Sequence, residues 1–112
     1  MTNYRKDSEW NNEMELRCLL IFKTLEAERF PRGRQLELCR ELSRRSSLDA
    51  ENLSAKVSNY KSVAGVNKHS NASENTISMF KKYGKLSISE IDALADDQRK
   101  QRQTVHSTCV AA

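Results

Sequence analysis

Glycine and proline, the residues that most often form tight turns, are scarce in this chain. Its 112 residues include three glycines and one proline. Each β-hairpin needs such turn residues, so a fold built of many short strands would leave most of its turns without them. The scarcity therefore predicts an all-α fold.

Chain length and composition limit the number of domains. A chain of this length leaves little room for a second hydrophobic core. Hydrophobic residues make up 38% of the sequence and charged residues 30%, which allows a modest core and differs from a disordered chain. We expect an N-terminal tail at residues 1–7, one helical domain at 8–96, and a polar helix extension with a disordered tail at 97–112.

Hydrophobic residues recur at helical spacing in five stretches. The first stretch is apolar on more than one side, which predicts a central helix. The predicted helices are about residues 8–29, 31–45, 49–63 and 72–83, with a last helix that opens at Ser87.

Boundary residues support this division. Capping serines precede three of the predicted helices, at Ser8, Ser46 and Ser87. The predicted helix ends coincide with residues that stop a helix or open the next one, namely Pro31, Gly65 and Gly84.

The basic side chains are concentrated in the middle third of the chain. Residues 29–61 carry eight basic and four acidic side chains, whereas residues 1–28 are net acidic and the whole chain has a net charge of +4. Nucleic-acid-binding proteins gather basic residues on one face, so the location of the charge matters more than its total. The middle third is therefore the candidate binding segment.

The order of elements in this segment matches a trihelical helix-turn-helix: a long helix, a short basic helix, a tight turn and a third helix. The third helix has an apolar face beside a polar one. Asparagine can pair with adenine edges in the major groove, and lysine can reach guanine or phosphate. We expect this helix to enter the groove with Asn52, Lys56 and Asn59.

Phosphate contacts are expected from the neighbouring basic residues, because such contacts fix the register of a protein on DNA. The expected residues are Arg32, Arg34, Arg40, Arg44, Arg45 and Lys61. An ordinary solvated surface is the alternative interpretation of the same polar residues. Gathering of these cations on one surface would favour DNA binding, and their scattering would favour a protein-interaction module.

The segment also resembles a known family. The matching features are Trp10 and Glu13 at the head of the first helix, Glu41-Leu42-Ser43 in the second, and Leu53, Lys56 and Asn59-Tyr60 in the third. About half of the chain resembles the small trihelical, Myb-like DNA-binding modules found ahead of HNH-type or restriction-type nucleases in phages and other mobile elements. The resemblance implies DNA engagement, without cleavage since no nuclease domain accompanies it.

Catalytic and metal-binding signatures are weak. The two histidines, His69 and His106, fall in a predicted loop and a predicted tail, and the chain has no Walker or HExxH motif. Three cysteines without a CxxC pair suggest neither a disulfide framework nor a zinc site, and they favour a reducing cytoplasm. We expect no enzyme activity, no cofactor, no metal, and no membrane span or secretory signal.

These features together predict a non-enzymatic, cytoplasmic DNA-binding protein whose partner is double-stranded DNA. A homodimer is expected if binding is sequence-specific, because a monomer of this size covers little DNA. The alternative is a small phage or mobile-element protein-interaction module that binds a host or defence protein.

Overall fold

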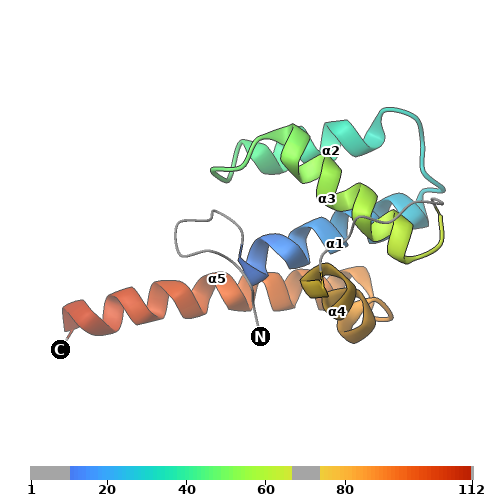
Figure 1. Ribbon diagram of the computed structural model, residues 1–112. Coiled ribbons are helices and arrows are strands. Elements are labelled where there is room, and N and C mark those ends of the chain that lie inside the picture. Colours follow the sequence, from blue (N-terminus) through green and yellow to red (C-terminus); the bar gives the residue numbers. More distant parts are fainter. Residues whose placement is uncertain (1–10, 67–73, 112) are drawn as a thin grey trace.

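The computed structural model describes residues 11–66 and 74–111 and shows five helices and no strand in them (Figure 1). This architecture confirms the prediction of a small all-α bundle. The helices are α1 (Asn12–Ala27), α2 (Arg34–Ser43), α3 (Ala50–Val63), α4 (Glu74–Tyr83) and α5 (Ile88–Ala111).

Helix α1 is the centre of the bundle, as its apolar pattern predicts. It contacts each of the other four helices. In Figure 1, α5 runs along one side of α1, while α2 and α3 lie on the opposite side. Its buried apolar residues therefore face several directions: Met14, Leu16, Cys18, Leu19, Ile21, Phe22 and Leu25.

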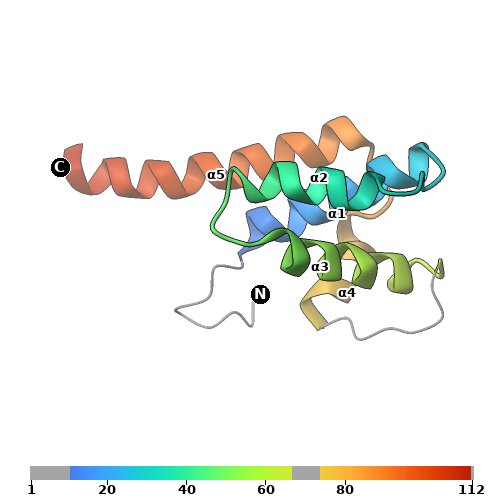
Figure 2. The same cartoon turned by 90° about the horizontal axis from the view of Figure 1, so that it is seen from above.

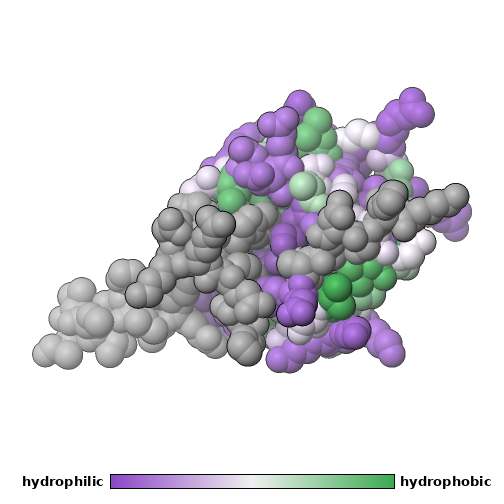
Figure 3. Space-filling model, in the orientation of Figure 1, coloured by the Kyte–Doolittle hydropathy of each residue, from purple (hydrophilic) through white to green (hydrophobic). Residues whose placement is uncertain are grey.

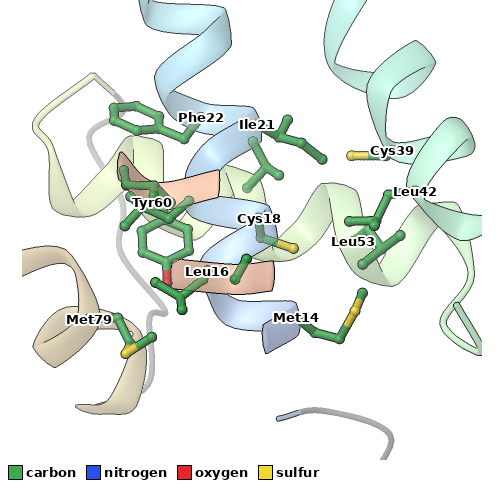
Figure 4. Packing of buried hydrophobic residues seen from close by; sticks show 14 of the residues in the cluster. Met14, Leu16, Cys18, Ile21, Phe22, Cys39, Leu42, Leu53, Tyr60 and Met79 are labelled. Carbon is green, nitrogen blue, oxygen red and sulfur yellow. The ribbon is translucent and has the colours of Figure 1, made fainter. Parts of the chain in front are cut away.

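The core joins side chains from all five helices. Figure 4 shows α1 residues meeting α2 at Cys39, α3 at Leu53 and α4 at Met79. Helix α5 adds Ile91 and Ala95, both fully buried. Aromatic rings fill the region near α4, because Phe22 and Phe80 lie edge to face with ring centroids 6.1 Å apart.

Three predicted helix starts differ from the observed ones. Asn11 caps α1 through its side chain, which accepts a hydrogen bond from the Met14 N–H; Ser8 lies outside the described residues. Helix α2 begins at Arg34 instead of Pro31, because the chain first passes through Gly33 at φ +81°. Helix α3 is capped by Asp49, not Ser46.

The turn before α3 explains the last difference. The Asp49 backbone is extended, and its carboxylate accepts from the Asn52 N–H at 2.8 Å. The Ser46 hydroxyl is instead engaged with the backbone of Leu48, two residues along. An acid three residues after a serine can therefore be the cap itself, and not the partner in a capping box.

The start of α5 agrees with the sequence, whereas its end does not. The Ser87 N–H donates to Glu90 Oε1, and the Glu90 N–H donates to Ser87 Oγ, which is the predicted capping box. The helix then continues to Ala111, into the range 97–112 where the sequence predicts a disordered tail. No glycine or proline follows Gly84, and nothing therefore interrupts the helix.

Helices α1 and α3 end in the same hydrogen-bond pattern. Val66 N–H bonds to the Lys61 carbonyl and Gly65 N–H to that of Ser62, while Gly65 has φ +87°. At the end of α1, the position equivalent to Gly65 is Arg29, with φ +66°. A side chain in this left-handed conformation costs about 1–2 kcal/mol, so Arg29 is a strained residue.

Replacing Arg29 with glycine should stabilise the protein. Relief of the left-handed strain outweighs the added freedom of the unfolded chain, and we expect a gain of about 0.5–1 kcal/mol in the free energy of unfolding. Urea denaturation followed by circular dichroism measures it. The opposite kind of change at the equivalent position of α3, Gly65→Ala, should lower the free energy of unfolding by about 1 kcal/mol. The loss comes from the left-handed backbone alone, because nothing else lies within 4 Å of a Cβ at that position. An unchanged or lower stability of Arg29→Gly contradicts the strain.

Candidate nucleic-acid interface

Helix α3 lies between α2 and α4, and Figure 2 shows this order from above. Its apolar side is fully buried at Leu53, Val57 and Tyr60. Its outer side carries Asn52 and Ala55, which are exposed, and one turn further Asn59, which is half-buried. Two of the three predicted groove residues therefore lie on the outer side of α3.

The third predicted groove residue, Lys56, lies inside the protein. Its Nζ donates to Glu15 Oε1 at 2.8 Å and to Thr76 Oγ1 at 2.9 Å. Only 13% of its side chain is exposed, and none of Glu15 is. The prediction of a continuous polar row is therefore wrong at Lys56, because its long side chain turns from the edge of α3 toward a buried carboxylate.

Glu15 is the centre of a polar cluster that joins three helices. Tyr60 on α3 donates its hydroxyl hydrogen to Glu15 Oε2 at 2.7 Å, and Thr76 on α4 donates to Glu15 Oε1 at 3.3 Å. Both carboxylate oxygens are thus satisfied in a fully buried position. We refer to Glu15, Lys56, Tyr60 and Thr76 as the Glu15 cluster.

Sequence reasoning missed Glu15, although one signal was available. Glu15 lies between Met14 and Leu16 in a helix that is apolar on several sides. An acid in such a helix must either reach solvent or meet a cation inside the protein. The sequence does not say which cation, because Lys56 is 41 residues away.

Two further predicted contact residues take part in contacts within the protein. Arg34 donates to Glu28 Oε1 at 3.0 Å and also pairs with Glu37, and these hydrogen bonds raise its pKa further above the ordinary arginine value. Lys61 donates to Gln35 Oε1 at 3.1 Å, and its Nζ lies 5.3 Å from the centre of the Phe30 ring.

Four of the predicted arginines are exposed and form no ion pair within the part of the chain that is described: Arg32, Arg40, Arg44 and Arg45. They do not share one surface with Lys56 and Lys61. Arg45 lines a cavity of about 130 Å³ between α1 and α2, together with Leu20, Leu38 and Leu42. The predicted cations are therefore not gathered on one surface, an outcome that favours the protein-interaction alternative. Of the four exposed arginines, Arg40 lies within α2 and Arg44 caps its C-terminus.

The outer surface over α2 and α3 is mostly hydrophilic. Figure 3 shows mostly hydrophilic residues over these helices, with small hydrophobic spots among them and a larger hydrophobic area where α3 ends and α4 lies. The large hydrophobic residues exposed in the described chain lie on separate elements, at Leu36, Val66 and Ile88. A broad apolar docking face is therefore not part of the described surface on α3.

Neither a family model, nor a curated protein, nor a solved structure matches this chain at a significant level. In residues 11–66 and 74–111, no group of three His, Cys, Asp or Glu side chains is arranged to hold a metal ion. No helix in the same ranges has the length and apolar character needed to cross a bilayer.

Removing the Lys56 charge should destabilise the fold strongly. Lys56→Met leaves the Glu15 carboxylate buried without its cation, and we expect a loss of about 3 kcal/mol in the free energy of unfolding. Adding Glu15→Gln should recover about 1–2 kcal/mol, because a neutral amide needs no counter-charge. Denaturant titration of the two single variants and the double variant measures this coupling.

Lys100→Met is the matched control, since Lys100 pairs with Asp96 on the exposed side of α5. Its stability should stay close to that of the unmodified protein. Equal losses for the Lys56 and Lys100 variants, or strictly additive effects at positions 15 and 56, would contradict the importance of the buried pair.

Both described cysteines should react slowly in the folded protein. Burial raises the pKa of the Cys39 thiol to about 11, and burial followed by the nearby Glu15 charge raises that of Cys18. At pH 8 the thiolate fraction of Cys39 is then about 0.1%. Iodoacetamide labelling, followed by mass spectrometry of each peptide, should show slow reaction that increases about tenfold from pH 8 to pH 9. Labelling of Cys39 as fast as in urea would rule out this protection.

Proposed function

We propose that this chain is a non-enzymatic DNA-binding module of the cytoplasm, in which the outer side of α3 enters the major groove. The main support for this proposal is the set of residues on that side of the helix. Asn52, Ala55 and Asn59 combine two amides with one small residue, so the helix can approach base edges closely. Glu51, in the first turn, is the one acid on α3.

The exposed arginines of α2 support the same proposal. Arg40 lies on α2, the helix next to α3, and Arg44 caps the C-terminus of that helix; neither is neutralised by an ion pair in the described chain. Arginines of this kind can bind phosphates without breaking contacts within the protein. Arg34, Lys56 and Lys61 are removed from the proposed contact set, because they already serve the fold.

The helix-turn-helix outline and the resemblance to Myb-like modules of phages and mobile elements belong to this proposal as well. In such modules the helix after the tight turn is the one that reads bases. Here α3 follows the turn at residues 44–49, and the exposed asparagines lie on it. We infer double-stranded DNA as the partner, with two copies binding together at a specific site.

One observation favours a second candidate, a phage or mobile-element module that binds a host or defence protein. The cavity between α1 and α2 is lined by apolar residues together with Arg17, Glu41 and Arg45. Such a cavity can accept one apolar side chain of a partner. This candidate predicts no DNA affinity, so the titration below decides between the two.

DNA binding should be measurable by fluorescence anisotropy with a random 20-base-pair duplex. We expect affinity at 50 mM salt that falls steeply by 200 mM, because phosphate contacts release counterions. Arg40→Gln with Arg44→Gln should reduce the slope of log affinity against log salt by about 2, at about 0.9 for each lost contact. Asn52→Ala with Asn59→Ala should leave this slope unchanged, and should reduce the preference among duplex sequences once a preferred one is selected.

Lys100→Gln controls for the loss of an exposed charge away from the proposed interface. It should bind like the unmodified protein. Absence of binding at 50 mM salt, or equal weakening by the control, contradicts the proposal. Lys56 variants are not informative in this assay, because a loss of binding would report the loss of the buried pair.

A further inference from the structure

A second basic cluster lies where α4 ends and the chain turns toward α5. Lys81, Lys82 and Lys85 are exposed, and none of them forms an ion pair in the described residues. No acid occurs between Glu74 and Glu90. We call these three lysines the α4 corner. They lie outside residues 29–61, the basic segment identified from the sequence, and were therefore not predicted as contact residues.

The α4 corner is held in a defined position. The Gly84 N–H bonds to the Phe80 carbonyl at 2.7 Å, and the Gly84 carbonyl accepts from Lys23 Nζ of α1 at 2.8 Å. A Cβ at position 84 would collide with the Phe80 carbonyl oxygen, so glycine is required there. The end of α4 and the turn after it, which carry the lysines, are therefore fixed to the central helix.

Local structure explains the lysines only in part. Two of them lie in the last turn of α4, where the helix dipole favours cations. Lys82 also lies 5.3 Å from the centre of the Tyr83 ring. Lys85 is beyond the helix and has neither role. All three ammonium groups remain in contact with solvent, so they can bind an anion without breaking an ion pair.

The arrangement of the helices relates the α4 corner to the proposed DNA-binding helix. Helix α3 contacts both α2 and α4 and lies between them (Figure 2). A helix in the major groove has the phosphates of one strand on each side. The exposed arginines of α2 and the lysines of α4 thus belong to the elements on the two flanks of α3.

We propose that Lys81, Lys82 and Lys85 bind the phosphate backbone of one DNA strand while Arg40 and Arg44 bind that of the other. This inference rests on the proposed function, since it requires α3 to lie in the groove. It assigns the recognition of duplex DNA to two phosphate-binding surfaces, one on each side of α3. The lysines supply affinity and orientation but no base specificity.

The test compares the triple variant Lys81→Gln/Lys82→Gln/Lys85→Gln with Arg40→Gln/Arg44→Gln and with the control Lys100→Gln. Circular dichroism first establishes that each variant is folded. In the salt titration, the triple variant should lose about 2–3 from the slope of log affinity against log salt, and about tenfold or more in affinity at 50 mM salt. The control should lose neither.

Phosphate-ethylation interference on a single selected duplex then assigns the strands. The unmodified protein should show interference on both strands. Within the half-site bound by one copy, the lysine variant should lose the signals of one strand and the arginine variant those of the other. A triple variant that keeps the original slope while the arginine variant loses its own overturns this inference and leaves the proposed function standing. Loss of signals from the same strand in both variants also overturns it. Absence of binding by the unmodified protein overturns both.

Discussion

The fold depends on the burial of one carboxylate. Glu15 has no exposed surface, and desolvating a charge is costly unless a cation and hydrogen-bond donors replace water. Lys56, Tyr60 and Thr76 supply them from α3 and α4. Apolar packing alone tolerates small shifts between helices, whereas this cluster is satisfied in one arrangement. It therefore fixes how α3 and α4 lie against α1, and with that which side of α3 faces solvent.

The same cluster separates cations that hold the fold from those that can meet a partner. Lys56 and Arg40 contribute equally to the net charge, yet Lys56 is neutralised inside the protein and Arg40 lies on its surface. The exposed positive charges that a partner can meet therefore lie in two places, at α2 and at the α4 corner, and not throughout the middle third of the sequence. The electrostatic field that a ligand meets is set by these exposed groups.

The sequence predicts what depends on neighbours along the chain. The periodic apolar residues predict the five helices, and the Ser87–Glu90 box is observed with both of its hydrogen bonds, since its members are three residues apart. Contacts between distant residues could not be predicted in this way. Lys56 on the edge of α3 has the pattern of a surface residue, because its partners Glu15 and Thr76 are 41 and 20 residues away in the sequence. Asn52 and Arg40 are exposed and stay predicted contact residues, whereas Lys56 is taken up by partners that the local sequence pattern does not reveal.

The position of Thr76 also shows that the three-helix outline depends on the helices that follow it. Three helices would be enough to present α3 in a trihelical outline, but Thr76 and Met79 arrive only with α4, and Ile91 and Ala95 only with α5. A fragment ending after α3 would expose the side of α1 that α5 covers and would leave the Glu15 carboxylate short of a donor. The last two helices are thus not additions to an autonomous trihelical domain. They supply part of the shared core and one of the hydrogen bonds to Glu15, so α3 owes its orientation partly to residues that follow it in the chain.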